Sequence, residues 1–399
     1  LPLAAIRTMR LRTLAYLVIL GTILGCSQEI KKETNPLNEK LVGEWELVVE
    51  KSNRFDYYRP FGIAFSADSI EFFNGFFKRD IDSLTGKRKY RYFGNFTKYK
   101  IQSDSFLIQS VFDSTWNYWN TYIELRGDTL VLADSDSTQK KFVRLNYNLD
   151  TMQQFDQIIY SSSGCYGSCP ILDFSLNRNG QFLFQGEGYT ESLGFFKGKL
   201  TKDHTNFIFN KFRKAGILHI GKHHNIGHTD DQTITTTYII DGEIVSTIHD
   251  YGMAGPNKLV WAHVPISNAY KKASLDSIPE DDPFYPKLGY FKFKKDSLIL
   301  SLEKSESFYL WTELKKSNKV DTTFKSIYEL GFKGNFTYWG PDPNESRQHK
   351  MKIESIKTDG RMFTFHFENN KKETYDLGYN FIDKNYSVNN FRKPKDWEL

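Results

Sequence analysis

Two cysteines lie four positions apart in the middle of the chain, in the segment SGCYGSCP at 163–170. Cys165 and Cys169 could close a disulfide, act as a redox thiol pair or supply two ligands to a metal ion. A redox role needs a helix N-terminus or nearby cations to lower a thiol pKa, but a strand-like run, ILDF, follows this pair. Zinc needs three or four ligands from the protein. The pattern therefore favours a structural disulfide, in which Gly167 gives the tight loop its backbone freedom.

Histidines gather in one later segment and form a second set of candidate ligands: His219, His223, His224 and His228. Two pairs have the i, i+4 spacing that places ligands on one face of a helix, and Asp230 or Asp231 could complete a zinc-type site. Gly221, Asn225 and Gly227 argue against a helix through the segment. We therefore favour a solvated histidine-rich loop. A metal ion at these histidines is the alternative, and no other cofactor is predicted.

The third cysteine, Cys26, ends an N-terminal segment of a type found in exported proteins. Three arginines lie within the first twelve residues, an apolar run follows at 13–24, and Gly25 precedes the cysteine. The run is shorter than the ~20 apolar residues of a membrane-spanning helix, so the order of features predicts a cleaved signal peptide over 1–25. The segment resembles a bacterial lipoprotein signal peptide, which implies lipidation of Cys26 and a membrane anchor.

Residues 26–37 then combine the lipidated cysteine with a polar tether that shows no apolar periodicity. Ser27 is permissive for outer-membrane sorting in lipoproteins of Gram-negative bacteria, and the acidic and lysine residues nearby resemble the export tags of Bacteroidetes surface lipoproteins. The expected location is the outer membrane, with the lipid-anchored protein facing the periplasm or the cell surface. An exported location also favours a disulfide between the two remaining cysteines.

The composition excludes a nucleic-acid partner and favours β-structure. The formal net charge of +5 falls to +2 without residues 1–25, because that segment carries three arginines and no acid. A chain so close to neutral lacks the basic surface that nucleic-acid binding requires. The 33 phenylalanines and 23 tyrosines suit half-buried sheets better than helix bundles.

The rhythm of strands, turns and helices predicts a mainly β protein with an α+β middle. A barrel is expected over 38–150, an α+β domain with an antiparallel sheet and two helices over 151–275, and a C-terminal β-rich domain over 287–399. The proline and acidic residues of 276–286 indicate a linker before the last domain.

Eight or nine short strands joined by tight turns make the first module an up-and-down barrel. Its opening Gly43-Glu44-Trp45 resembles the start of the lipocalin-like domains common in bacterial lipoproteins. The resemblance implies that Trp45 plugs one end of the barrel and that Arg144, from the last strand, packs over the indole. A barrel of this size either holds one small apolar ligand or is filled by side chains, and the many aromatic residues favour filling.

The middle module has two expected helices, at 201–214 behind Thr201 as N-cap and at 256–272 with a kink or break at Pro265. Its Cys-x-Gly-x-Cys-Pro element resembles a bacterial domain family of unknown function. The hairpin, helix, threonine-rich strand and final helix that follow the element match the pattern of that family. The resemblance implies no established chemistry.

The sequence pattern of the last module predicts hairpins throughout. Their strands include 298–302 and 308–314. The sequence contains no nucleophile elbow, HExxH zinc motif, Walker loop or complete dinucleotide-binding glycine pattern. We therefore expect a non-catalytic binding or interaction role, with an envelope protein or a small apolar ligand in the barrel as partner. The alternative is a metal-dependent or thiol-based enzyme centred on the middle domain.

Overall fold

Most of the chain beyond residue 35 can be followed in the computed structural model. The described residues are 36–49, 60–81, 88–285, 287–333, 336–338, 347–349 and 352–395. Residues 43–399 form one unit, and the short helix α2 (Pro36–Leu41) belongs to the unit before it. The predicted signal peptide, Cys26 and the first part of the tether lie outside the described residues. No helix in the described chain is long and apolar enough to cross a membrane.

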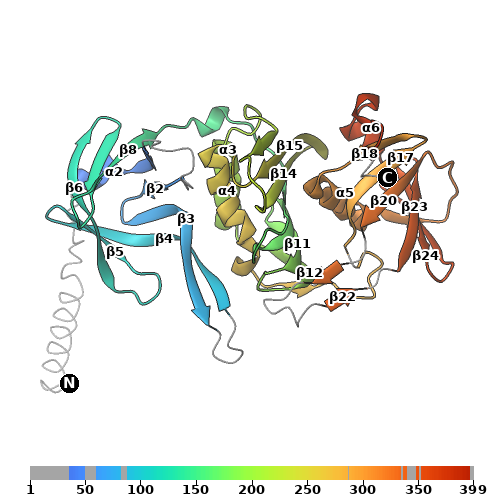
Figure 1. The fold of residues 1–399 in the computed structure, drawn as a ribbon, viewed down its shortest axis with the longest axis horizontal. Coiled ribbons are helices and arrows are strands. Elements are labelled where there is room, and N and C mark those ends of the chain that lie inside the picture. The colour runs from blue at the N-terminus through green and yellow to red at the C-terminus, as the bar shows by residue number, and fades with distance from the viewer. Residues whose placement is uncertain are drawn as a thin grey trace, which may run out of the picture. The chain divides into compact units, whose positions relative to one another are not determined.

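Eight antiparallel strands close into the predicted up-and-down barrel, in sequence order (Figure 1). They are β1 (Gly43–Leu47), β2 (Gly62–Phe65), β3 (Ser69–Ile81), β4 (Arg88–Gln102), β5 (Ser105–Gln109), β6 (Trp116–Arg126), β7 (Thr129–Ala133) and β8 (Gln139–Leu145). Aromatic rings contact one another inside it: the Phe65 centroid lies 5.1 Å from Tyr99 and 5.7 Å from Phe106, and Phe72 lies 5.3 Å from Trp119. These contacts favour a barrel filled by its own side chains.

The middle module is an eight-stranded sheet in the order β13-β15-β14-β9-β10-β11-β12-β16. Its strands are β9 (Gln157–Ser162), β10 (Ile171–Asn177), β11 (Gln181–Gly188), β12 (Gly194–Lys199), β13 (His223–Asn225), β14 (Thr233–Ile240), β15 (Glu243–Tyr251) and β16 (Asp276–Ser277). The sheet departs from the expected antiparallel pairing at one edge, where β13 runs parallel to β15. A short 3-10 turn, η1 (Leu149–Thr151), leads into the module from the barrel.

Both predicted helices of this module are present. α3 (Lys202–Lys214) begins behind Thr201, whose side chain accepts the His204 N–H. α4 (Asn257–Ser267) contains Pro265 and is followed by the 3-10 turn η2 (Ala269–Lys272). One hydrophobic core joins these helices to one face of the sheet, and Figure 1 shows them side by side on that face.

The C-terminal module is a seven-stranded sheet in the order β18-β17-β20-β23-β24-β25-β19. Its elements are β17 (Gly289–Lys295), β18 (Leu298–Ser301), α5 (Lys304–Lys316), β19 (Asn318–Val320), β20 (Tyr328–Lys333), β23 (Ile353–Thr358), β24 (Met362–Phe367), β25 (Lys372–Asp376), α6 (Phe381–Asn385) and η4 (Val388–Asn390). A separate pair joins β21 (Phe336–Tyr338) and β22 (Arg347–His349).

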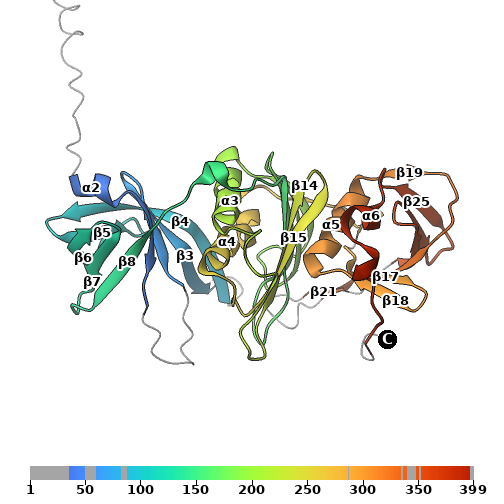
Figure 2. The same ribbon diagram turned by 90° about the horizontal axis from the view of Figure 1, so that it is seen from above.

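The predicted strand at 308–314 is wrong, because these residues belong to helix α5. A capping box starts the helix: the Glu303 side chain accepts from the backbone of Glu306, and the Glu306 side chain accepts the Glu303 N–H at 2.8 Å. The helix packs on β9, β10 and β14 of the middle sheet and on β17 of the C-terminal sheet (Figure 2). Burial on both sides removes the polar stripe by which an amphipathic helix is recognised.

The segment 276–286, predicted as a linker, contributes to the fold. β16 pairs with β12, and Ile278, Phe284 and Tyr285 are buried in the hydrophobic core that also holds α5. That core takes in Ile159 and Ile239 from the second face of the middle sheet. The middle and C-terminal modules therefore share one core rather than being joined by a flexible segment.

The barrel is fixed to the middle module by buried polar contacts. Lys211 of α3 lies 2.6 Å from Glu71 of β3, and both side chains are buried. Burial raises the pKa of Glu71 and lowers the pKa of Lys211. Trp261 of α4 donates its indole N–H to the Pro60 carbonyl at 3.1 Å. These contacts hold the barrel against α3 and α4.

Candidate functional site

The disulfide loop connects two central strands of the middle sheet. β9 and β10 pair antiparallel, with Ser161 opposite Asp173, and residues 163–170 join them. The predicted disulfide is present, since Cys165 and Cys169 are bonded with their Cα atoms 5.7 Å apart. Gly167 has a φ of +154°, in a region that other residues rarely adopt. The bond closes a small ring that displays Tyr166, whose side chain is 90% exposed.

Two neighbouring loops hold this ring in place. The Tyr166 N–H donates to the Asp230 carbonyl at 2.9 Å, and the Gln232 side-chain amide donates to the Ser163 and Pro170 carbonyls, both at 2.8 Å. Residues 226–232 are in turn tied to 251–255, because Gly252 N–H donates to the Gln232 carbonyl at 3.0 Å. We call these three segments, 163–170, 226–232 and 251–255, the loop cluster.

The loop cluster exposes apolar side chains on a fixed backbone. Tyr166, Ile226 and Met253 are among the exposed large hydrophobic residues of the described chain. The Asp231 N–H donates to the Tyr251 hydroxyl at 2.9 Å, which adds a further tie between two of the loops. An exposed aromatic residue on a restrained loop loses little conformational entropy when it binds, and such residues serve as anchors at protein interfaces.

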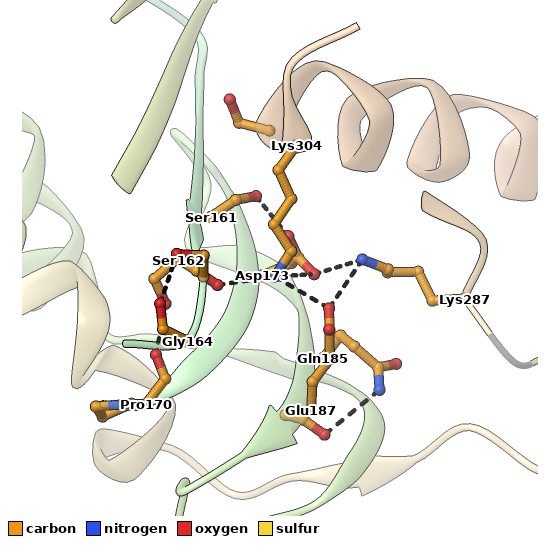
Figure 3. A network of polar contacts seen from close by, with 12 residues as sticks. Ser161, Ser162, Gly164, Pro170, Asp173, Gln185, Glu187, Lys287 and Lys304 are labelled. Carbon is orange, nitrogen blue, oxygen red and sulfur yellow. Dashed lines mark hydrogen bonds and ion pairs between the residues drawn. The ribbon is translucent and has the colours of Figure 1, made fainter. Parts of the chain in front are cut away.

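A buried network of four charges underlies the loop (Figure 3). Lys287 Nζ lies 2.5 Å from Asp173 Oδ2 and 3.1 Å from Glu187 Oε1, and Lys304 Nζ lies 3.5 Å and 3.1 Å from the same two oxygens. The Ser161 hydroxyl donates to Asp173 at 2.5 Å. Each of the four charged residues is less than a tenth exposed.

The network is linked directly to the disulfide loop. Lys304 donates to the Ser162 carbonyl at 2.8 Å, and the Ser162 hydroxyl donates to the Pro170 carbonyl at 2.8 Å. Pro170 follows Cys169 immediately. The lysines come from the C-terminal module and the acids from the middle sheet, so the network both joins the two modules and supports the base of the loop cluster.

Burial and ion pairing shift the pKa values of the network residues in opposite directions. Burial raises the pKa of Asp173. Burial also disfavours ionised Glu187, but the charges of Lys287 and Lys304 outweigh it and hold the pKa of Glu187 below the usual glutamate range. Burial opposes the charge of Lys304, yet Asp173 and Glu187 raise its pKa above the usual lysine value. The two lysines face two carboxyl groups away from solvent, an arrangement suited to structural pairing.

We expect the disulfide to stabilise the folded protein measurably. In the chain-entropy treatment, a ring of five residues contributes about 2 kcal/mol to the free energy of unfolding. The oxidised protein should be two hydrogens lighter than the reduced protein, and Cys165→Ser with Cys169→Ser should lower the urea midpoint correspondingly. Adding reductant to the wild type should reproduce that shift and leave the double variant unchanged. Equal stability of oxidised and reduced protein would contradict the expectation.

The four predicted histidine ligands lie around the edge strand β13. His219 is in the exposed segment after α3, His223 and His224 are in β13, and His228 lies 2.5 Å from Asp231. The structure also brings His249 of β15 near this segment, with its ring centroid 5.7 Å from that of His223. Across the described residues, no group of three or more histidine, cysteine, aspartate or glutamate side chains has the geometry to hold a metal ion.

One pair in this region is unusual. His224 lies opposite Asp250 in the β13–β15 register, and His224 Nε2 and Asp250 Oδ2 are buried without a hydrogen-bond partner in the described structure. Burial raises the pKa of Asp250. Two side chains fall short of the three protein ligands of a catalytic zinc site. Metal binding by the histidine segment stays the alternative to a solvated loop.

The predicted barrel-closing residues lie together on the paired strands β1 and β8. The Arg144 guanidinium lies 4.1 Å from the centre of the Trp45 ring, and the two residues are opposite each other in the β1–β8 register. Trp45 is completely buried. A Cβ atom on Gly43 would lie 2.6 Å from Arg144 Nη1, so glycine makes room for the guanidinium.

Sequence reasoning missed the buried network entirely. Asp173 is a single acid in the apolar run ILDF, and such an inward charge on a central strand is a signal that could have been used. Its partners Lys287 and Lys304 are more than a hundred positions away, and nothing local identifies them. Lys304 was also placed between two predicted strands rather than in the first turn of a helix.

Comparison with known proteins identifies one domain. Residues 156–270 match the family described as a domain of unknown function (DUF6438). The match covers the sheet from β9 to β15 together with α3 and α4, and it contains the disulfide loop. No curated protein matches the chain. The middle module therefore contains a domain of unknown function, as predicted, and the family description assigns it no activity.

Proposed function

We propose that this chain is a lipid-anchored envelope lipoprotein with a non-catalytic binding role, in which the loop cluster of the middle domain binds a protein partner. The observation that carries the proposal is the exposure of Tyr166 on a ring closed by a disulfide and tied to two further loops. A ring that leaves its aromatic residue 90% exposed contributes little to the core. Its rigidity instead suits recognition, because a fixed anchor binds at a small entropic cost.

The chemistry of the surrounding groups also supports binding over catalysis. The two cysteines are bonded to each other, and the two acids and two lysines beneath them are buried in a balanced network. Asp231 is paired with His228, and His249 lies 3.3 Å from Glu303. These pairings leave the apolar and aromatic side chains as the distinctive exposed feature of the loop cluster.

The binding role is tested by photo-crosslinking in intact envelopes. A photoreactive phenylalanine analogue at position 166 should give a discrete adduct with an envelope protein. The same analogue at Val388, which is 80% exposed in the C-terminal module, is the matched control and should give none. Cys165→Ser with Cys169→Ser should weaken the adduct because the ring is then no longer fixed.

Lipid anchoring is tested separately with radiolabelled palmitate. Label should enter the wild-type chain and be absent from Cys26→Ser. An unlabelled wild-type chain would overturn the lipid anchor. An adduct equally strong at 166 and 388, or none at 166, would overturn the binding role of the loop cluster. Stoichiometric zinc in native mass spectra, lost on His223→Ala, would favour the metal-dependent alternative.

A further inference from the structure

We propose that the outer face of β4, β5 and β6 docks the barrel on a lipid bilayer that carries anionic headgroups. The proposal rests on the lipid anchor put forward above, and it names a second attachment to the same membrane. We call the side chains involved the outer patch: Lys100, Leu107, Trp116, Tyr118 and Ile123.

The strand register places Lys100, Leu107 and Tyr118 of the outer patch on one surface. Lys100 lies opposite Leu107, and Leu107 lies opposite Tyr118, so the three form a row across the strands. The next pair along the strands, Ile101 and Phe106, faces the aromatic interior of the barrel. Because neighbouring residues of a strand point to opposite faces, the first row faces outward.

The patch is apolar and aromatic but not covered. Trp116, Tyr118 and Ile123 are 40%, 42% and 45% exposed. Tyr118 and Ile123 line one open hollow of about 490 Å³ together with residues of the 133–139 turn. Exposed apolar side chains that adjoin one another mark an interaction surface rather than the scattered exposure normal for a soluble protein.

The chemistry of the patch fits a membrane interface. Tryptophan and tyrosine are enriched at headgroup depth, where the ring is apolar and its polar atom reaches water. Lys100 Nζ lies 4.5 Å from the centre of the Trp116 ring, which places a cation beside the ring that would enter the interface. A lysine there attracts anionic headgroups while its stem stays along apolar surface.

Two of the acids beside the outer patch are already paired with a cation. Asp134, in the turn that borders the hollow, lies 2.6 Å from Lys140. Glu124, which follows Ile123, lies 3.0 Å from Arg126. Asp113 and Asp136 are also exposed in the loops beside the patch, so the attraction to an anionic surface comes from Lys100 and not from the net charge of this face.

The length of the tether brings the barrel within reach. Nine residues separate Cys26 from Pro36, and an extended chain spans about 3.5 Å per residue, so the tether reaches about 35 Å at most. The barrel is the first module after it. A tether of this length keeps a weak docking surface at a high effective concentration near the bilayer, so modest affinity is sufficient.

The test uses the chain from Ser27 onward, which keeps every described residue and lacks only the predicted signal peptide and Cys26 with its lipid. Co-sedimentation with vesicles of phosphatidylcholine and phosphatidylglycerol (3:1) should show binding that weakens as salt rises. Trp116→Ala with Tyr118→Ala should weaken it at least tenfold. Lys100→Gln should weaken it about fivefold on these vesicles and leave binding to pure phosphatidylcholine unchanged.

Ile327→Ala is the control, because it removes an apolar side chain that is 48% exposed in the C-terminal module and should not alter vesicle binding. Absence of vesicle binding by the wild-type chain, or equal binding by the Trp116/Tyr118 variant, would overturn the docking proposal. A photoreactive analogue at position 118 that captures a protein while vesicles fail to bind would also overturn it. Palmitate labelling and the adduct at position 166 do not involve the outer patch, so the proposed function stands or fails independently.

Discussion

Replacing Lys304 by methionine is expected to lower the free energy of unfolding by about 3–5 kcal/mol, the usual cost of removing one partner from a buried ion network. Methionine matches the length of the lysine stem, so packing is kept and charge is lost. Glu187 and Asp173 would then share Lys287 as their remaining cation in the network, inside a site from which solvent is excluded. The Ser162 carbonyl would also lose its donor.

Lys316→Met on the same helix is the matched control for this change. Lys316 also forms an ion pair, with Glu313 at 2.7 Å, but its side chain is 54% exposed. Exposed pairs of this kind contribute at most about 1 kcal/mol, so the variant should unfold like the wild type. Urea unfolding followed by circular dichroism measures both, and hydrogen exchange in α5 locates the change.

Replacing all four charged residues of the network together distinguishes the effect of an unpaired buried charge from the effect of altered packing. Changing Asp173 and Glu187 to leucine together with Lys287 and Lys304 to methionine should recover most of the stability lost in Lys304→Met, because no unpaired charge is left buried. If Lys304→Met alone were as stable as the wild type, the network would not join the two modules. If it destabilised the chain without increasing exchange in α5, the loss would lie elsewhere.

The contrast between α3 and α5 shows how far local sequence determined the fold. α3 was predicted because Thr201 caps it and because one face is apolar while the other meets solvent. α5 was missed because it lies between two sheets, and its run Phe308–Trp311 is buried on every side. Its start signal was present, as Glu303 and Glu306 form a capping box, but glutamate is a less familiar N-cap than serine or threonine.

The candidate site also has parts that the local sequence predicts and parts that depend on distant residues. The cysteine pair could be predicted to close a ring because both partners are local and an exported protein is oxidised. That Tyr166 would be fully displayed, and that Gln232 would hold the ring, depends on contacts nearly seventy positions apart in the chain. The ion pairs of the four-charge network join residues a hundred or more positions apart, which no spacing in the sequence encodes.

Replacing Trp45 by alanine is expected to destabilise the barrel by about 3–5 kcal/mol, the cost of removing a large ring from a packed interior. Trp45 is completely buried, and it pairs with Ile63 on one side and Arg144 on the other. Arg144→Met should cost less, about 0.5–2 kcal/mol, because it removes a cation from the ring face but keeps a stem over the indole. The ring, rather than the cation, then closes this end of the barrel.

Trp116→Ala provides the control for this prediction, since it removes the same side chain from the outside of the same barrel. Trp116 is exposed, and its loss should change the free energy of unfolding by less than about 1 kcal/mol. Thermal unfolding followed by near-ultraviolet circular dichroism reports on both indoles. Equal effects of Trp45→Ala and Trp116→Ala would contradict a packed barrel end and would point instead to an interior that already tolerates empty space, as a barrel that carries a ligand must.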